Sequence, residues 1–183
     1  MDKLTIQIVA IAVPAILSWC MAAARRPPRV DQATGAMILE YGWPLRLIGV
    51  VTGVAMPIAL VCLAFVFPPR TLQDALSAGA LMLGFTLLGG VLLVETTRVR
   101  LWLHRGSIVS YSPWRETRTL RWAEVGKVSY SGTNKWFVIE GPRGVKIRAH
   151  VLLVGIGSLV EAIRTKIPPE RYAQARAGFA EVE

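Results

Sequence analysis

Three long apolar stretches dominate the first half of the chain, at residues 4–24, 45–67 and 75–97. Each has about 20 residues or more, enough for a helix to cross the roughly 30 Å hydrocarbon core of a bilayer. Their interiors carry almost no charge, because Arg46 and Glu95 lie near the ends, where long side chains reach headgroups or water. The pattern predicts an integral membrane protein with three transmembrane helices.

The period of the apolar residues changes from helical to alternating near residue 98, which predicts strands in place of helices. Leu101 and Leu103 alternate with Trp102 and His104, and five further short runs of the same kind follow, separated by turn sequences. Short antiparallel strands in this number predict a small half-barrel or sandwich.

Helical spacing returns after the strands. Ser158 and Glu161 have the spacing of a capping box at the start of a helix, and Pro168 and Pro169 mark its end. A short amphipathic tail helix is expected in residues 169–183. The predicted fold class is α+β, with a membrane domain over residues 1–97, an antiparallel β domain and its closing C-terminal helix over residues 98–168, and the tail.

The loop after the first apolar stretch begins with a basic segment that contains Arg25, Arg26 and Arg29. Asp31 is placed to cap a short helix over residues 32–41, which would lie in the membrane interface. An ordinary loop with a few apolar residues is the alternative that the sequence leaves open.

Positive charge is concentrated in the second half of the chain. From Arg98 onward, fifteen lysines and arginines stand against seven acids, so this part holds +8 of the net charge of +9. The loop at Arg25 and the segment after Arg98 are the most basic flanks of the apolar stretches, and the positive-inside rule places both in the cytoplasm and the N-terminus outside. A bacterial cytoplasmic membrane is the expected location. Retention of the first helix is expected, with cleavage near Ala24 as the alternative.

Small residues recur at a spacing of four in two of the apolar stretches, as Gly49 with Gly53 and as Ala80 with Gly84. Such pairs let membrane helices approach closely. They are the candidate helix-packing residues. Packing within the chain is one use, and self-association or docking to a larger membrane complex is the other.

Basic and aromatic side chains are the candidates for binding. Anionic lipid attracts each nearby lysine or arginine by about 1 kcal/mol, and the membrane tether makes lipid a simpler partner than nucleic acid, which is not expected. Alternation puts Arg115 and Arg121 on one face of a strand and Arg118 on the other. Trp114 follows a proline in a turn. The candidate contacts with headgroups or a partner are Arg25, Arg26, Arg29, Arg118, Lys146, Arg148 and Trp114.

The sequence offers no chemistry for catalysis. It has no phosphate-binding glycine loop, no metal-ligand spacing and no nucleophile beside a base. Its two histidines, His104 and His150, occur among basic residues in predicted strands and are expected to be exposed. We therefore expect a protein that is not an enzyme and has no cofactor or metal. The apolar stretches also lack the central ionisable residue that transport proteins use.

Residues 115–128, RETRTLRWAEVGKV, resemble the central motif of bacterial pleckstrin-homology-like domains. The matching positions are Leu120, Trp122, Glu124, Val125 and Val128. Residues 103–112 are similar to the first hairpin of that family, and residues 141–167 to its last strand and closing helix, so the resemblance covers about 70 residues. It implies a cytoplasmic domain attached to membrane helices, without catalytic residues. The layout also resembles assembly proteins of photosynthetic complexes that carry this domain.

Two functions remain open. The first is a membrane-anchored accessory, scaffold or assembly protein, whose β domain docks another integral membrane protein. The second is a regulatory module that senses anionic phospholipid through its basic face. A homo-oligomer is compatible with both.

Overall fold

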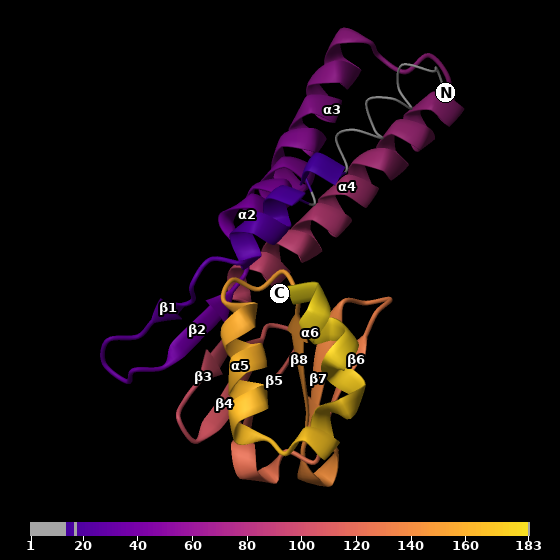
Figure 1. The fold of residues 1–183 in the computed structure, drawn as a ribbon. Helices are drawn as coiled ribbons and strands as arrows, with labels where there is room; N and C mark the ends of the chain where they lie inside the picture. Colours follow the sequence, from indigo (N-terminus) through magenta and orange to yellow (C-terminus); the bar gives the residue numbers. More distant parts are fainter. Residues whose placement is uncertain (1–13, 17, 183) are drawn as a thin grey trace. The chain divides into compact units, whose positions relative to one another are not determined.

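The computed structural model describes residues 14–16 and 18–182 (Figure 1). The chain divides into two compact units. The β unit combines Met1–Gly42 with Val99–Glu183, and the helical unit is Trp43–Arg98.

The helical unit is a pair of long apolar helices. Helix α2 (Trp43–Val50), the π-helical segment η1 (Val51–Ala55) and α3 (Met56–Val66) run on as one helix, and α4 (Leu72–Arg98) follows after a short turn. Each is long and apolar enough to cross a membrane, with 24 and 27 residues. Two of the three predicted apolar helices are therefore present at nearly the predicted positions.

The third predicted span, residues 4–24, is not confirmed. It lies largely outside the described residues, and within it residues 14–16 and 18–24 are helical. This leaves two candidate membrane helices in the part of the chain that the structure describes.

The β unit contains two antiparallel sheets (Figure 1). The five-stranded sheet has the order β1 (Arg29–Val30), β2 (Met37–Glu40), β3 (Arg100–Leu103), β4 (Ser107–Ser112) and β5 (Arg115–Arg121). The three-stranded sheet has the order β6 (Lys127–Ser131), β7 (Trp136–Glu140) and β8 (Lys146–His150). Short 3-10 turns at Trp122–Glu124 and Pro142–Gly144 join β5 to β6 and β7 to β8. All six predicted strands are present, and no closed barrel forms.

The first loop contributes a hairpin to the five-stranded sheet. Residues 32–41 therefore form neither the predicted interfacial helix nor an ordinary loop. Strand β2 pairs with β3 over four residues, and β1 pairs with β2. Asp31 caps the turn of this hairpin, since its carboxylate accepts from the Thr34 hydroxyl at 2.6 Å and from the Ala33 amide at 3.3 Å. Those bonds hold the pKa of Asp31 below its usual value. The Asp31 side chain therefore forms a local turn motif, and its interpretation as a helix cap is wrong.

Alternation decides which strand residues form the core. The inner face of the five-stranded sheet buries Leu101, Leu103, Ile108 and Leu120, each at most 3% exposed. The other sheet and the closing helix complete the core with Phe137, Ile139, Ile147, Leu159 and Ile163. Trp122 is 5% exposed and belongs to the same core.

The closing helix α5 (Ile156–Lys166) begins two residues before the predicted capping box. Its N-cap is Gly155, which has a positive φ of 80° that glycine adopts without strain. Ser158 therefore lies inside the first turn, and the capping-box interpretation is wrong. The helix ends at Lys166, just before Pro168, where the prolines were expected to stop it.

The tail packs on the core through aromatic rings. It consists of a 3-10 segment, η4 (Pro169–Ala175), and a short helix, α6 (Arg176–Val182). Phe179 is 3% exposed and lies 5.8 Å from Phe137 and 5.6 Å from Tyr172, measured between ring centroids. At Gly178, an added Cβ would lie 2.5 Å from the Tyr130 ring, so only glycine fits this approach.

We expect acid to loosen the tail through Glu181. Its carboxylate accepts from Tyr130 Oη and lies 2.7 Å from Lys135 Nζ, and these interactions, Lys135 first, hold its pKa below its usual value. A carboxyl whose pKa falls on folding stabilises the fold above its unfolded pKa, and this contribution is lost as pH falls below about 4.5. Thermal unfolding measured from neutral to acidic pH should show a smaller loss of stability in Glu181→Gln than in the parent protein. Equal losses in both proteins would contradict this role for Glu181.

Candidate interaction surface

The outer face of the five-stranded sheet carries an apolar row. Opposed residues in antiparallel strands point to the same side, and the register aligns Ile38 with Trp102, Trp102 with Val109, and Val109 with Thr119. Ile38, Trp102 and Val109 are each half-buried, and Thr119 is exposed. We call these four residues the Trp102 row. Large aromatic side chains flanked by aliphatic ones are typical of the centre of a protein interface.

Cationic side chains surround the Trp102 row. Arg29 lies opposite Ile38 at one end, and Arg121 lies opposite Ser107 at the other. Arg100 lies between Glu40 and Tyr111, and its Nε is 3.9 Å from the Glu40 carboxylate. Tyr111 is 41% exposed and adds a second aromatic ring. The rim therefore favours a partner surface that carries acids around an apolar centre.

The outer face of the three-stranded sheet carries a second aromatic and cationic group. The Arg148 guanidinium lies over the Trp136 ring, 5.3 Å from its centroid, and His150 meets the same ring edge-on at 6.4 Å. His150 is not exposed, contrary to expectation. Its Nδ1 accepts from the Leu152 amide at 3.1 Å, and burial lowers its pKa, which favours the neutral ring. The side chain is therefore engaged in local structure.

Lys146 and Lys127 flank Glu140 on the same outer face. The register aligns Glu140 with both lysines, and Lys146 Nζ lies 2.8 Å from its carboxylate. That contact, ahead of the other influences, lowers the pKa of Glu140. The face formed by Lys127, Lys146 and Arg148 keeps a net positive charge after this pairing.

Arg118 does not project from the surface with the other candidate contacts. Its Nη1 donates to the Lys146 carbonyl oxygen at 2.8 Å, so the side chain links β5 to β8. An irregularity between Ser110 and Ser112 then aligns Arg115 with Ser112. Because residues two apart in β4 share a face, Arg115 lies on the same side as Arg118 rather than with Arg121. The β-bulge reverses the predicted grouping.

The remaining candidates lie apart from these faces. Trp114 is 56% exposed in the turn between β4 and β5. Arg25 and Arg26 are exposed just after the helical residues that end at Ala24. Only Arg29 of this basic segment joins the rim of the Trp102 row.

Glycines bring the two apolar helices into contact. A Cβ at Gly49 would lie 3.1 Å from the Leu93 backbone, and a Cβ at Gly53 would lie 2.7 Å from the Gly89 backbone. Gly84, by contrast, has no other atom within 4 Å of such a Cβ. Two of the four predicted packing residues therefore lie at the crossing, and Gly89 replaces Gly84 as their counterpart on α4.

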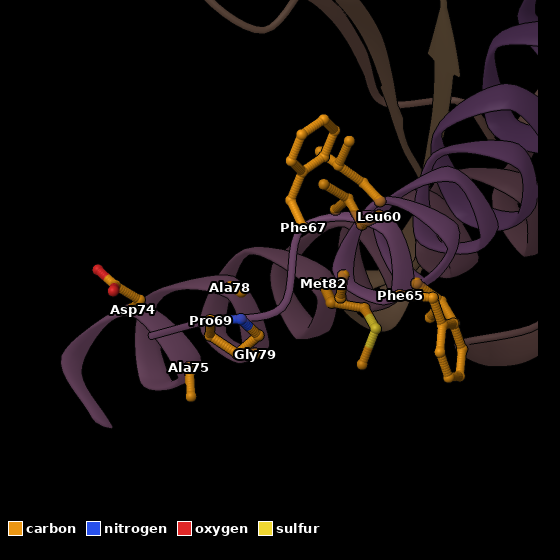
Figure 2. A pocket seen from close by; sticks show the side chains of 12 residues that line it. Leu60, Phe65, Phe67, Pro69, Asp74, Ala75, Ala78, Gly79 and Met82 are labelled. Atoms are coloured by element: carbon orange, nitrogen blue, oxygen red, sulfur yellow. The ribbon is translucent and has the colours of Figure 1, made fainter. Parts of the chain in front are cut away.

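Figure 2 shows an apolar groove between α3 and α4, near the turn that joins them. Its volume is about 590 Å³, and Asp74 is the single charged residue that lines it. Phe67 and Pro69 lie at the turn, and Leu60 and Met82 lie further along the two helices.

The described part of the chain contains no metal site and no buried side-chain polar atom without a hydrogen-bond partner. No cluster of three or more His, Cys, Asp or Glu side chains occurs among the described residues. Every buried side-chain nitrogen or oxygen there has a hydrogen-bond partner.

Sequence reasoning missed the Trp102 row because it missed β2. The signal was present: Asp31 and Gly35 bracket a turn, and the apolar run Met37–Glu40 follows it directly. A run of four apolar or mixed residues fits a strand or a helix equally well by period alone. Comparison with protein-family models, curated proteins and solved structures finds no match to this chain.

Proposed function

We propose that this chain is a membrane-anchored, non-catalytic accessory, scaffold or assembly protein that docks another membrane protein through its β unit. The observation that carries the proposal is the Trp102 row, a partly exposed apolar strip with a cationic rim. Two antiparallel sheets followed by a closing helix support a pleckstrin-homology-like fold for this unit. The basic residues that flank the apolar helices support a β unit on the cytoplasmic side of a bacterial membrane.

The chain connections favour a partner that is itself close to the membrane. Strand β2 ends at Glu40 and α2 begins at Trp43, while α4 ends at Arg98 and β3 begins at Arg100. Two residues separate β2 from α2, and one residue separates α4 from β3. Because a chain extends at most about 3.6 Å per residue, the ends of these strands lie close to the ends of the apolar helices. The two strands that supply Ile38 and Trp102 are thus tied to the membrane anchor.

The test is co-purification from native membranes in mild detergent, with Trp102→Ala compared with Trp136→Ala. Both variants remove a half-buried tryptophan from an outer sheet face, so loss of general stability should be similar. We expect the Trp102 variant to lose the partner by tenfold or more, since a central interface tryptophan commonly contributes about 2 kcal/mol or more. Equal retention by both variants, or a parent protein that purifies alone, contradicts the proposal.

A second candidate function is recognition of anionic phospholipid by the face formed by Lys127, Lys146 and Arg148. Its support is the net positive charge of that face. In nanodiscs, amide exchange in β7 and β8 should slow when anionic lipid replaces neutral lipid, and added salt should reverse the effect. No response of these strands to lipid charge would exclude this candidate.

A further inference from the structure

The groove between α3 and α4 extends along α4 over nearly the thickness of one leaflet of a bilayer. From Asp74 at the turn to Met82, α4 rises by about 12 Å, at 1.5 Å per residue, and both residues line the groove. One leaflet of a hydrocarbon core of roughly 30 Å is about 15 Å thick. The walls are apolar, and Ala75, Ala78 and Gly79 leave room on the α4 side. An extended acyl chain fits such a space.

Two charged residues lie at or next to the mouth of the groove: Asp74 lines it, and Arg70 follows Pro69, which also lines it. Asp74 Oδ2 accepts from the Thr71 amide at 3.2 Å, and the Asp74 amide donates to the Thr71 hydroxyl at 3.1 Å, which caps α4. The second carboxylate oxygen, Oδ1, has no partner among the described residues. Arg70, four residues earlier, is exposed and likewise makes no hydrogen bond or ion pair in the described part of the chain.

We propose that this groove binds a zwitterionic phospholipid. One acyl chain lies between α3 and α4, the lipid ammonium group meets Asp74, and the lipid phosphate meets Arg70. An anionic lipid without an ammonium group would leave Asp74 facing a negative headgroup, so the charges at the mouth favour the zwitterionic class. The inference rests on the proposal that α3 and α4 span the membrane, and it concerns a site separate from the Trp102 row.

The experiment is native mass spectrometry of the full chain released from nanodiscs of phosphatidylethanolamine and phosphatidylglycerol in equal amounts. We expect phosphatidylethanolamine to be enriched severalfold in the retained lipid. Ala78→Leu, which fills the groove, should abolish this retention. Ala80→Leu is the matched control, because Ala80 is exposed on the same helix and does not line the groove. Asp74→Asn keeps a capping side chain and should remove the preference between the two lipids.

Several outcomes would overturn the proposal: no retained lipid, equal retention of both lipids by the parent protein, or equal effects of Ala78→Leu and Ala80→Leu. Cross-linking of Ala78→Cys to a helix of another protein, in place of lipid, would overturn it as well. Alkaline carbonate extraction separates this from failure of the membrane proposal, since a chain released by carbonate does not span the bilayer. Co-purification through Trp102 should be unchanged in the Ala78 variant.

Discussion

Gly89→Ala should break the contact between the two apolar helices. The new Cβ would lie 2.2 Å from the Gly53 nitrogen and 2.3 Å from the Gly53 Cα, and both are backbone atoms. A backbone cannot rotate aside as a side chain can, so the helices must separate along their whole crossing. Overpacking of this kind costs about 3 kcal/mol, at the upper end of its range. The van der Waals contacts that hold membrane helices together would be lost with it.

Local helix geometry makes this crossing less adaptable. The π-helical segment Val51–Ala55 contains Gly53, and Pro57 follows four residues later without an amide to bond the Gly53 carbonyl. Within the same stretch, the Thr52 hydroxyl donates to the Ile48 carbonyl oxygen at 2.7 Å. Prolines and π-helical segments are the usual sites of bends in helices, and here both lie beside the glycine contact.

The measurement is unfolding of the purified chain by increasing SDS in mixed micelles, followed by circular dichroism. Gly84→Ala is the matched control, since a Cβ at Gly84 meets nothing within 4 Å. We expect the Gly89 variant to unfold at clearly lower SDS and the Gly84 variant to match the parent protein. Identical midpoints for Gly89→Ala and the parent protein would show that the glycine contact does not hold the helices.

Phe137→Ala should be the most destabilising single truncation in the β unit. Phe137 is fully buried, and its ring lies 5.1 Å from Tyr130 and 5.8 Å from Phe179 between centroids. Removing a buried phenylalanine costs about 3–5 kcal/mol, through lost transfer free energy and the cavity that remains. Because Phe179 belongs to α6, the cavity should also release the tail from the core.

The free energy of unfolding of the β unit, from denaturant titration of the full chain by tryptophan fluorescence, tests this expectation. Val138→Ala is the control, because Val138 is the next residue along β7 and lies on the half-buried outer face. We expect a loss below about 1 kcal/mol there, as for other substitutions outside the core. A Phe137 variant no less stable than the Val138 variant would mean that the tail does not rely on this ring.

The sequence by itself determined the elements whose periodicity was long or repeated. The apolar stretches at residues 45–67 and 75–97 predicted α2–α3 and α4 to within three residues at each end, because apolar runs of this length are typical of membrane-spanning helices. Alternation likewise placed Leu101 and Leu103 in the core and Trp102 outside it. In both cases a local pattern repeats often enough to exclude other periods.

Tertiary structure decided what depends on contacts between distant segments. Residues 37–40 become a strand because β3 offers them a partner some 60 residues later, and that pairing creates the Trp102 row. Arg118 turns inward to the Lys146 carbonyl, and one bulge moves Arg115 beside it. Gly53 contacts Gly89 on α4 and not the predicted Gly84, because the position of the helix crossing decides which small residues touch. A short segment takes the conformation that its contacts in the folded protein stabilise, and those contacts come from residues far away in the sequence.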